Sequence, residues 1–143
     1  MYTKTIKILL IEENKNYAEH IKGLLEKHND QKFEITVVNR LSKGLLVIGS
    51  ESIDTVILDL SHPDCIGLET FRKLRTHMPH VPIIVLTTKG DYSHIKIGIE
   101  GAQNFISKES INSKVLTDNI LSSIEQVKIY KELSKHFSSA EAI

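Results

Sequence analysis

Short apolar runs typical of buried β-strands alternate along this chain with segments whose apolar residues recur at helical spacing. The strand-like runs cover residues 6–11, 33–38, 56–59, 81–88 and 104–108. The helical patterns cover residues 17–25, 41–48, 68–75, 92–100 and 111 to about 135. Regular alternation with short connections predicts a parallel sheet with helices on both faces. Because crossovers between parallel strands are right-handed, we expect a doubly wound α/β domain.

Three helix ends carry their own signals. Asn14 precedes the first helical pattern and is a predicted N-cap. Gly49 is the predicted stop of the second helix, and Gly101 that of the fourth. The last pattern has a different property, because its apolar stripe continues past Val127, where we expect no sheet left to cover.

Composition narrows the class of protein. With 143 residues and 41% hydrophobic residues, the chain suits one globular domain with an extension. Its 18 basic and 18 acidic residues balance, which argues against a dominant surface for nucleic acid or membranes. A single cysteine, Cys65, excludes an internal disulfide framework. No apolar run approaches the ~20 residues that span a bilayer, and a cytoplasmic location is expected.

Charged and hydroxyl side chains stand where the predicted strands end: Glu12, Glu13, Asp59, Thr87 and Lys108. Each one alone is more often a turn, cap or surface residue. In a parallel sheet, however, the carboxyl ends of all strands share one edge, where ligands bind. Clustered carboxylates repel one another unless a cation neutralises them, and oxygen ligands suit Mg²⁺. An Asp beside Mg²⁺ and a lysine can act as a nucleophile toward phosphorus.

From Lys7 to Val127 the chain resembles the receiver domain of response regulators. The matching stretches are residues 8–14, 58–69, 82–87 and 101–108, and the second has the spacing Asp59, Pro63, Gly67. This resemblance implies a flavodoxin-like, five-stranded parallel sheet in the order 2-1-3-4-5, with helices on both faces; the chain adds an extended C-terminal helix.

The resemblance also implies a metal site. Asp59 matches the phosphoacceptor of the family, and Glu13 the acid that ligates Mg²⁺ directly. Asp59 and the backbone carbonyl of Ser61 would complete the protein ligands, while Glu12 matches the acid that usually holds the metal through water.

Three further residues match the switch of the family. Thr87 corresponds to the hydroxyl that turns toward the phosphoryl group, and Lys108 to the lysine that pairs with a phosphoryl oxygen. Phe105 corresponds to the aromatic residue that changes rotamer on activation. We expect phosphorylation to change the face formed by the fourth helix and the fifth strand.

The implied function is phosphoacceptor signalling in a two-component system. The phosphoryl donor would be a histidine kinase or a phosphotransfer protein, and the domain would catalyse only its own phosphorylation and dephosphorylation, without being an enzyme for another substrate. Residues 1–127 would form the receiver domain. Residues 128–143 would form a helical linker that leads to an output domain absent from this chain, or that pairs with a second copy. No direct contact with nucleic acid or membrane is expected.

Departures from the usual pattern keep an alternative open. Glu13 replaces the usual Asp, Thr88 is bulkier than the usual Ala, and Glu109 replaces the usual Pro. Glu13 and Thr88 favour a pseudo-receiver that signals without phosphate, whereas Glu109 affects the turn into the last helix. A phosphohydrolase with an Asp nucleophile is disfavoured, because the second acid of its Asp-x-Asp motif is Ser61 here. A flavin-binding relative is disfavoured because no phosphate loop follows the first strand.

Overall fold

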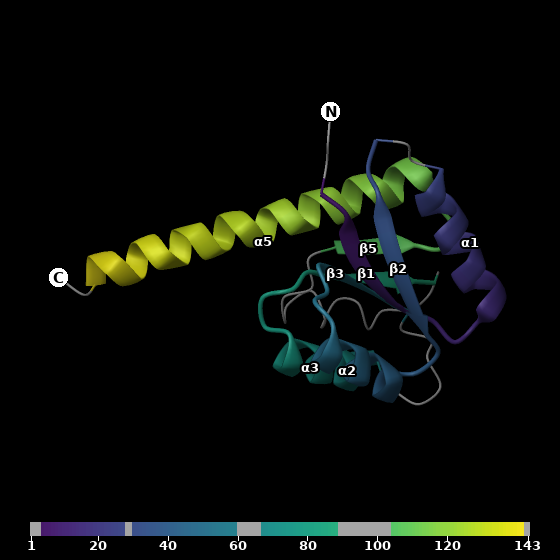
Figure 1. Cartoon of the computed structure of the whole chain (residues 1–143), viewed down its shortest axis with the longest axis horizontal. Coiled ribbons are helices and arrows are strands. Elements are labelled where there is room, and N and C mark those ends of the chain that lie inside the picture. Colours follow the sequence, from purple (N-terminus) through teal and green to yellow (C-terminus); the bar gives the residue numbers. More distant parts are fainter. Residues whose placement is uncertain (1–3, 28–29, 60–66, 89–103, 142–143) are drawn as a thin grey trace.

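The computed structural model describes residues 4–27, 30–59, 67–88 and 104–141. In this part of the chain the strands are β1 (Ile6–Ile11), β2 (Phe33–Val38), β3 (Thr55–Asp59), β4 (Ile83–Thr87) and β5 (Asn104–Ser107). The helices are α1 (Lys15–Glu26), α2 (Leu41–Ser50), α3 (Gly67–His77) and α5 (Ser113–Glu141). All neighbouring strands are parallel, in the order β2-β1-β3-β4-β5. The predicted doubly wound sheet is thereby confirmed (Figure 1).

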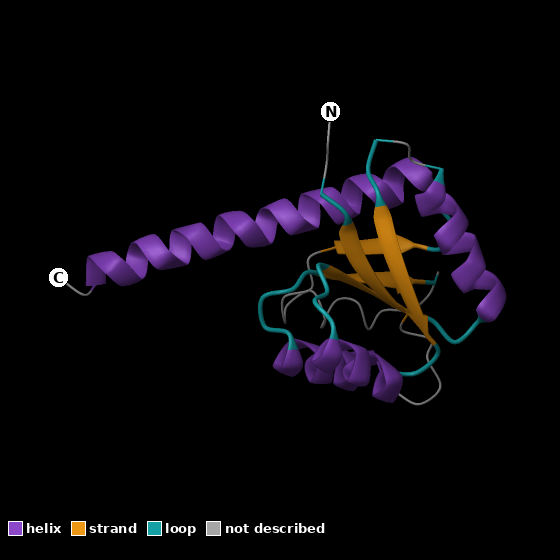
Figure 2. Ribbon diagram, in the orientation of Figure 1, coloured by secondary structure: helices purple, strands orange, loops and turns teal. Residues whose placement is uncertain are grey.

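Helices cover both faces of the sheet, with α1 and α5 on one side and α2 and α3 on the other (Figure 2). The alternation of side chains along β1 shows why. Ile8 and Leu10 belong to the core cluster under α1 and α5, whereas Leu9 and Ile11 belong to the cluster under α2 and α3. Every residue of the central strand β3 is buried, as expected for a parallel strand covered twice.

The helix ends agree with the predictions in part. Asn14 is the N-cap of α1, since its Oδ1 accepts a hydrogen bond from the Tyr17 N–H at 2.9 Å. The prediction that Gly49 stops α2 is wrong, because the helix continues through Ser50. There the Ser50 hydroxyl and the Glu51 N–H both bond to the carbonyl of Val47. These two donors bond to a carbonyl of the last helical turn, and no left-handed glycine is involved.

The first residues of β4 and α5 differ by two residues from the predicted ones. β4 begins at Ile83 and not at residue 81, because Pro82 has no N–H to donate. α5 begins at Ser113, behind Asn112, whose Oδ1 accepts from the Val115 N–H at 2.9 Å. The predicted helix over residues 92–100, with its stop at Gly101, lies outside the described residues.

The second half of α5 leaves the sheet (Figure 1). Leu116 and Ile120 near its start are fully buried against the sheet. Beyond Val127 the described side chains are exposed as far as residue 136, and they include the large apolar residues Ile129, Tyr130 and Leu133. The continuing apolar stripe therefore lies on the surface. Among the helices of the described residues, none is both long enough and apolar enough to cross a membrane.

Candidate functional site

Two acidic side chains are buried at the carboxyl edge of the sheet. Asp59 is the last residue of β3, and Glu12 directly follows β1; each is only 3% exposed. The two strands are paired, with Ile11 opposite Leu58, so the next residue on each strand is Glu12 and Asp59. Strand register thus places the two carboxylates side by side, as the sequence predicts.

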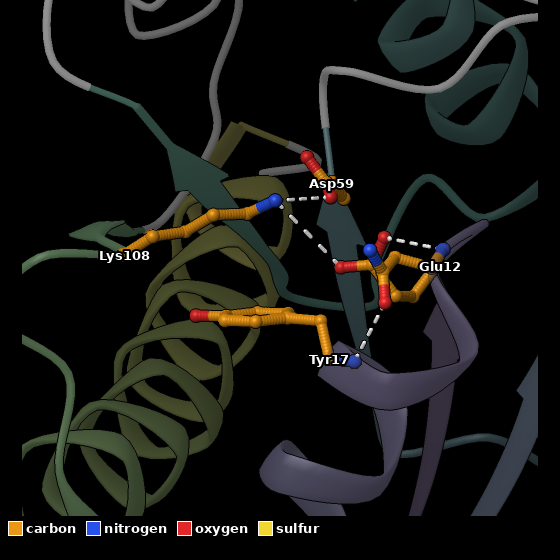
Figure 3. Close-up of polar contacts among 5 residues, drawn as sticks. Glu12, Tyr17, Asp59 and Lys108 are labelled. Carbon is orange, nitrogen blue, oxygen red and sulfur yellow. Dashed lines mark hydrogen bonds and ion pairs between the residues drawn. The ribbon is translucent and has the colours of Figure 1, made fainter.

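Lys108 follows the edge strand β5, and its side chain extends toward both acids (Figure 3). Its backbone N–H donates to the carbonyl of Thr87 at 2.9 Å, which holds the residue at the end of β4. Its Nζ lies 2.5 Å from Oδ2 of Asp59 and 3.8 Å from Oε1 of Glu12. The Lys108 side chain is 18% exposed, so this ion pair is largely shielded from water. A charge-assisted hydrogen bond of this kind is short and strong.

One ammonium leaves the two carboxylates with an excess of negative charge. Burial, followed by hydrogen bonding and repulsion from Asp59, raises the pKa of Glu12 to about 7. The Asn14 N–H, which donates to Oε2 of Glu12 at 3.2 Å, and the charge of Lys108 act in the opposite direction. Among the described residues nothing donates a hydrogen bond to Oε1 of Glu12. A buried oxygen without a donor beside a second carboxylate fits the chemistry of a Mg²⁺ site.

Of the other predicted metal ligands, Glu13 belongs to the described residues and Ser61 does not. Glu13 is exposed, and it lines a surface hollow of about 380 Å³ that Glu12 also borders. Within the described residues no three His, Cys, Asp or Glu side chains form a metal-binding group. Ser61, whose backbone carbonyl was predicted as a ligand, lies outside those residues. The metal roles of Glu13 and Ser61 therefore remain predictions.

The predicted switch residues lie on the two strands next to the acids. Thr87 ends β4 and is half-buried. Phe105 lies on β5 opposite Val85, and it packs, also half-buried, against the core cluster under α2 and α3. Both positions are compatible with the predicted roles, which no observation tests.

Tyr17, the first residue of the helical pattern predicted over residues 17–25, is a further member of the site. Its ring centroid lies 4.6 Å from Nζ of Lys108, and Figure 3 shows the lysine extending above the ring. Burial, with the charges of Glu12 and Asp59, raises the pKa of Tyr17 to about 12. The predicted cap at Asn14 was the available signal, because a helix that begins at the carboxyl edge brings its first turn to the site.

The fold is an open parallel α/β sheet, and its carboxyl edge carries paired acids and a lysine. These are the features that the resemblance to receiver domains implies. The response regulator receiver domain family matches residues 8–121. The chain is therefore a member of this family, as its resemblance predicts.

Curated relatives agree with this assignment. Response regulator ArlR of Staphylococcus saprophyticus is 33% identical over 103 residues, which cover 71% of this chain and 45% of the relative. Transcriptional regulatory protein CusR of Escherichia coli is 30% identical over 105 residues, covering 72% and 44%. The chain thus matches less than half the length of these relatives.

Solved structures share the fold. A response regulator receiver domain protein from Clostridium thermocellum has a TM-score of 0.77 and 29% identity, covering 87% of this chain and 98% of the other. A chain described as adenylate cyclase from Rhodopirellula baltica has a TM-score of 0.79 at 20% identity, covering 94% and 98%, and this likeness supports the fold alone.

Proposed function

We propose that this receiver domain accepts a phosphoryl group on Asp59 from a histidine kinase or a phosphotransfer protein. The observation that carries the proposal is the position of the Lys108 Nζ, 2.5 Å from Oδ2 of the buried Asp59. A carboxylate at the end of a buried strand, held by an ammonium, combines a nucleophile with a group that neutralises the charge of the product.

In the proposed reaction, a carboxylate oxygen of Asp59 attacks the phosphorus of a phosphohistidine. The new bond joins that oxygen to phosphorus, the phosphorus–nitrogen bond breaks, and its electron pair leaves with the imidazole. Lys108 starts on the Asp59 carboxylate and ends on a phosphoryl oxygen, so its charge stays at the reacting centre throughout. The domain turns over no other substrate.

Mg²⁺ is the cofactor that the donor set supports. Two buried carboxylates with one cation between them, and an Oε1 of Glu12 that no donor from the described residues reaches, suit a hard divalent ion. Asp59, Glu12, Glu13 and the Ser61 carbonyl would hold it. When bound, the ion supplies charge neutralisation for the phosphoryl oxygens.

Phosphorylation would then act as a switch. The aspartyl phosphate carries a charge of about −1.5 to −2 in place of the single charge of the carboxylate, and it attracts the Thr87 hydroxyl and Lys108. Phe105, half-buried on β5, would pack more deeply and change the surface beside this strand. The curated relatives are more than twice as long as their matched part, and we therefore propose that α5 leads to an output domain. We also propose that the protein acts in the cytoplasm.

A phosphate-independent pseudo-receiver is the second candidate. The observation in its favour is that Glu13 is exposed and that the described residues contain no group of three metal ligands. Such a domain would use the same fold to bind partners or a second copy without phosphoryl transfer.

Incubation with acetyl phosphate, with and without Mg²⁺, separates the two candidates by intact mass. The proposal predicts a gain of one phosphoryl group that requires Mg²⁺ and is absent in Asp59→Asn. Asp54→Asn is the matched control, because Asp54 precedes the same strand and its Oδ2 accepts from the Lys7 N–H, which an amide oxygen can also do. No gain in the wild type, together with no Mg²⁺ binding by calorimetry, would favour the pseudo-receiver.

A further inference from the structure

We propose that Tyr17 is a positioning residue, which holds the Lys108 ammonium against Asp59 through the face of its aromatic ring. This inference deepens the proposed function and rests on Asp59 being the phosphoacceptor. Tyr17 would touch neither the phosphoryl group nor the metal. Its effect would pass entirely through Lys108.

The geometry places the ammonium between a ring and two acids. Nζ of Lys108 lies 4.6 Å from the Tyr17 ring centroid, 2.5 Å from Oδ2 of Asp59 and 3.8 Å from Oε1 of Glu12. A lysine within about 6 Å of a ring centroid is attracted by the negative face of the ring, and more strongly when it is shielded from water. With its side chain 18% exposed, Lys108 meets both conditions.

Tyr17 is itself held in place. Its N–H is bound by the Asn14 side chain, which fixes the first turn of α1. Its ring packs at the edge of the core cluster under α1 and α5, and lies 5.6 Å, centroid to centroid, from the His20 ring. The hydroxyl is buried and has no hydrogen-bond partner within the described part of the chain. Packing and the capped first turn of α1 therefore hold the ring in place.

This support matters because lysine is a flexible residue. Its ammonium lies at the end of a flexible four-carbon stem. Ordering this stem costs side-chain entropy that the residue would keep if its ammonium were free in water. Tyr17 restricts Lys108 before the phosphoryl group arrives, so less ordering is left for the transition state. The residue belongs to α1, whereas Lys108 follows β5, so this contact links helix and strand at the site.

Two substitutions distinguish an effect of the aromatic ring face from an effect of side-chain volume. Tyr17→Phe keeps the ring and removes the hydroxyl, whereas Tyr17→Leu keeps apolar bulk and removes the ring. We expect Tyr17→Phe to retain most of the rate of phosphorylation by acetyl phosphate, and Tyr17→Leu to lose about three- to tenfold. Thermal unfolding of both variants checks that the fold is intact. Equal rates in the two variants would overturn the proposal.

A second measurement needs no phosphorylation. In ¹³C-lysine-labelled protein, the ε-methylene signal of Lys108, identified by its loss in Lys108→Arg, should be shifted upfield by the ring current. We expect that shift in the wild type and in Tyr17→Phe, and its loss in Tyr17→Leu. An unshifted signal in the wild type would refute the contact. If the contact is present but Asp59 takes no phosphoryl group, the proposed function fails while the pairing of Tyr17 with Lys108 stands.

Discussion

Nζ of Lys108 lies 2.5 Å from Oδ2 of Asp59, although 49 positions separate the two residues in the chain. The parallel sheet makes this approach possible, because β3, β4 and β5 end at the same edge. The same ammonium lies 3.8 Å from Oε1 of Glu12. One cation thus faces two buried acids, and the excess of negative charge is available for a metal ion.

Removal of the Lys108 charge should slow phosphorylation strongly. Lys108→Met keeps the length and the apolar stem of the side chain, but it cannot neutralise the phosphoryl oxygens. We expect the rate with acetyl phosphate to fall about 100-fold, as when one charge-stabilising donor is removed from an active site. Lys114→Met is the matched control, since Lys114 pairs with Asp118 on the exposed surface. Equal rates for Lys108→Met and wild type would contradict the role of Lys108.

The stability of the metal-free domain should depend on Glu12 and on pH. The pKa of Glu12 is raised in the folded protein from 4.5 to about 7, so the folded state binds more protons between these two values. Stability should therefore fall as pH rises through this range. Glu12→Gln should remove that loss and be more stable than wild type by about 2 kcal/mol at pH 8, with little difference at pH 4.5.

Urea unfolding in the presence of a chelator measures this effect. Glu19→Gln, in which an exposed glutamate of α1 is changed, is the control and should shift stability far less at either pH. A Glu12→Gln variant whose advantage does not grow with pH would show that the pKa of Glu12 is not raised in the folded protein.

Much of the fold was predictable, because strand-like runs alternate with helical patterns along the chain. Leu9 and Ile11 face one core while Ile8 and Leu10 face the other, and β-branched runs read as strands. Asp59 at the end of such a run predicted a carboxylate at the edge of the sheet where Glu12 and Lys108 also lie. The order of the strands came from resemblance to the receiver family, since alternation alone allows several orders.

Side-chain geometry was harder to predict from the sequence. The sequence places Lys108 at the edge, but it does not say that Nζ lies between the ring of Tyr17 and Asp59, because that depends on rotamers chosen in three dimensions. Gly49 misled for a related reason. A glycine permits a helix to end but does not require it. Here α2 ends one residue later, at Ser50, whose hydroxyl donates to the carbonyl of Val47.

Glycines inside helices offer a test of local packing. A methyl group added at Gly23 or Gly49 would meet nothing within 4 Å, whereas one added at Gly44 would lie 3.1 Å from Cδ1 of Ile11. Gly23→Ala should therefore stabilise the domain by about 0.5–1 kcal/mol, because alanine is the better helix former. Gly44→Ala should gain less or lose stability. Urea unfolding distinguishes these outcomes, and a larger gain at Gly44 would contradict the packing of α2 on β1.

The receiver domain should fold without the end of α5. The described side chains from Lys128 to His136 are exposed, so a chain that stops at Val127 loses little buried surface. We expect its free energy of unfolding to fall by no more than about 1 kcal/mol. Phosphorylation by acetyl phosphate should be retained. A truncated chain that is unfolded by circular dichroism would show that residues 128–143 belong to the domain.

The central claim is that Asp59 receives the phosphoryl group, and locating that group tests it most directly. After reaction with acetyl phosphate and Mg²⁺, borohydride reduces an aspartyl phosphate to homoserine, which survives digestion. Trypsin should release residues 44–72, which contain Asp54, Asp59 and Asp64. Fragmentation of this peptide should place homoserine at position 59 alone. Homoserine at position 54 or 64, or none in this peptide, would contradict the account.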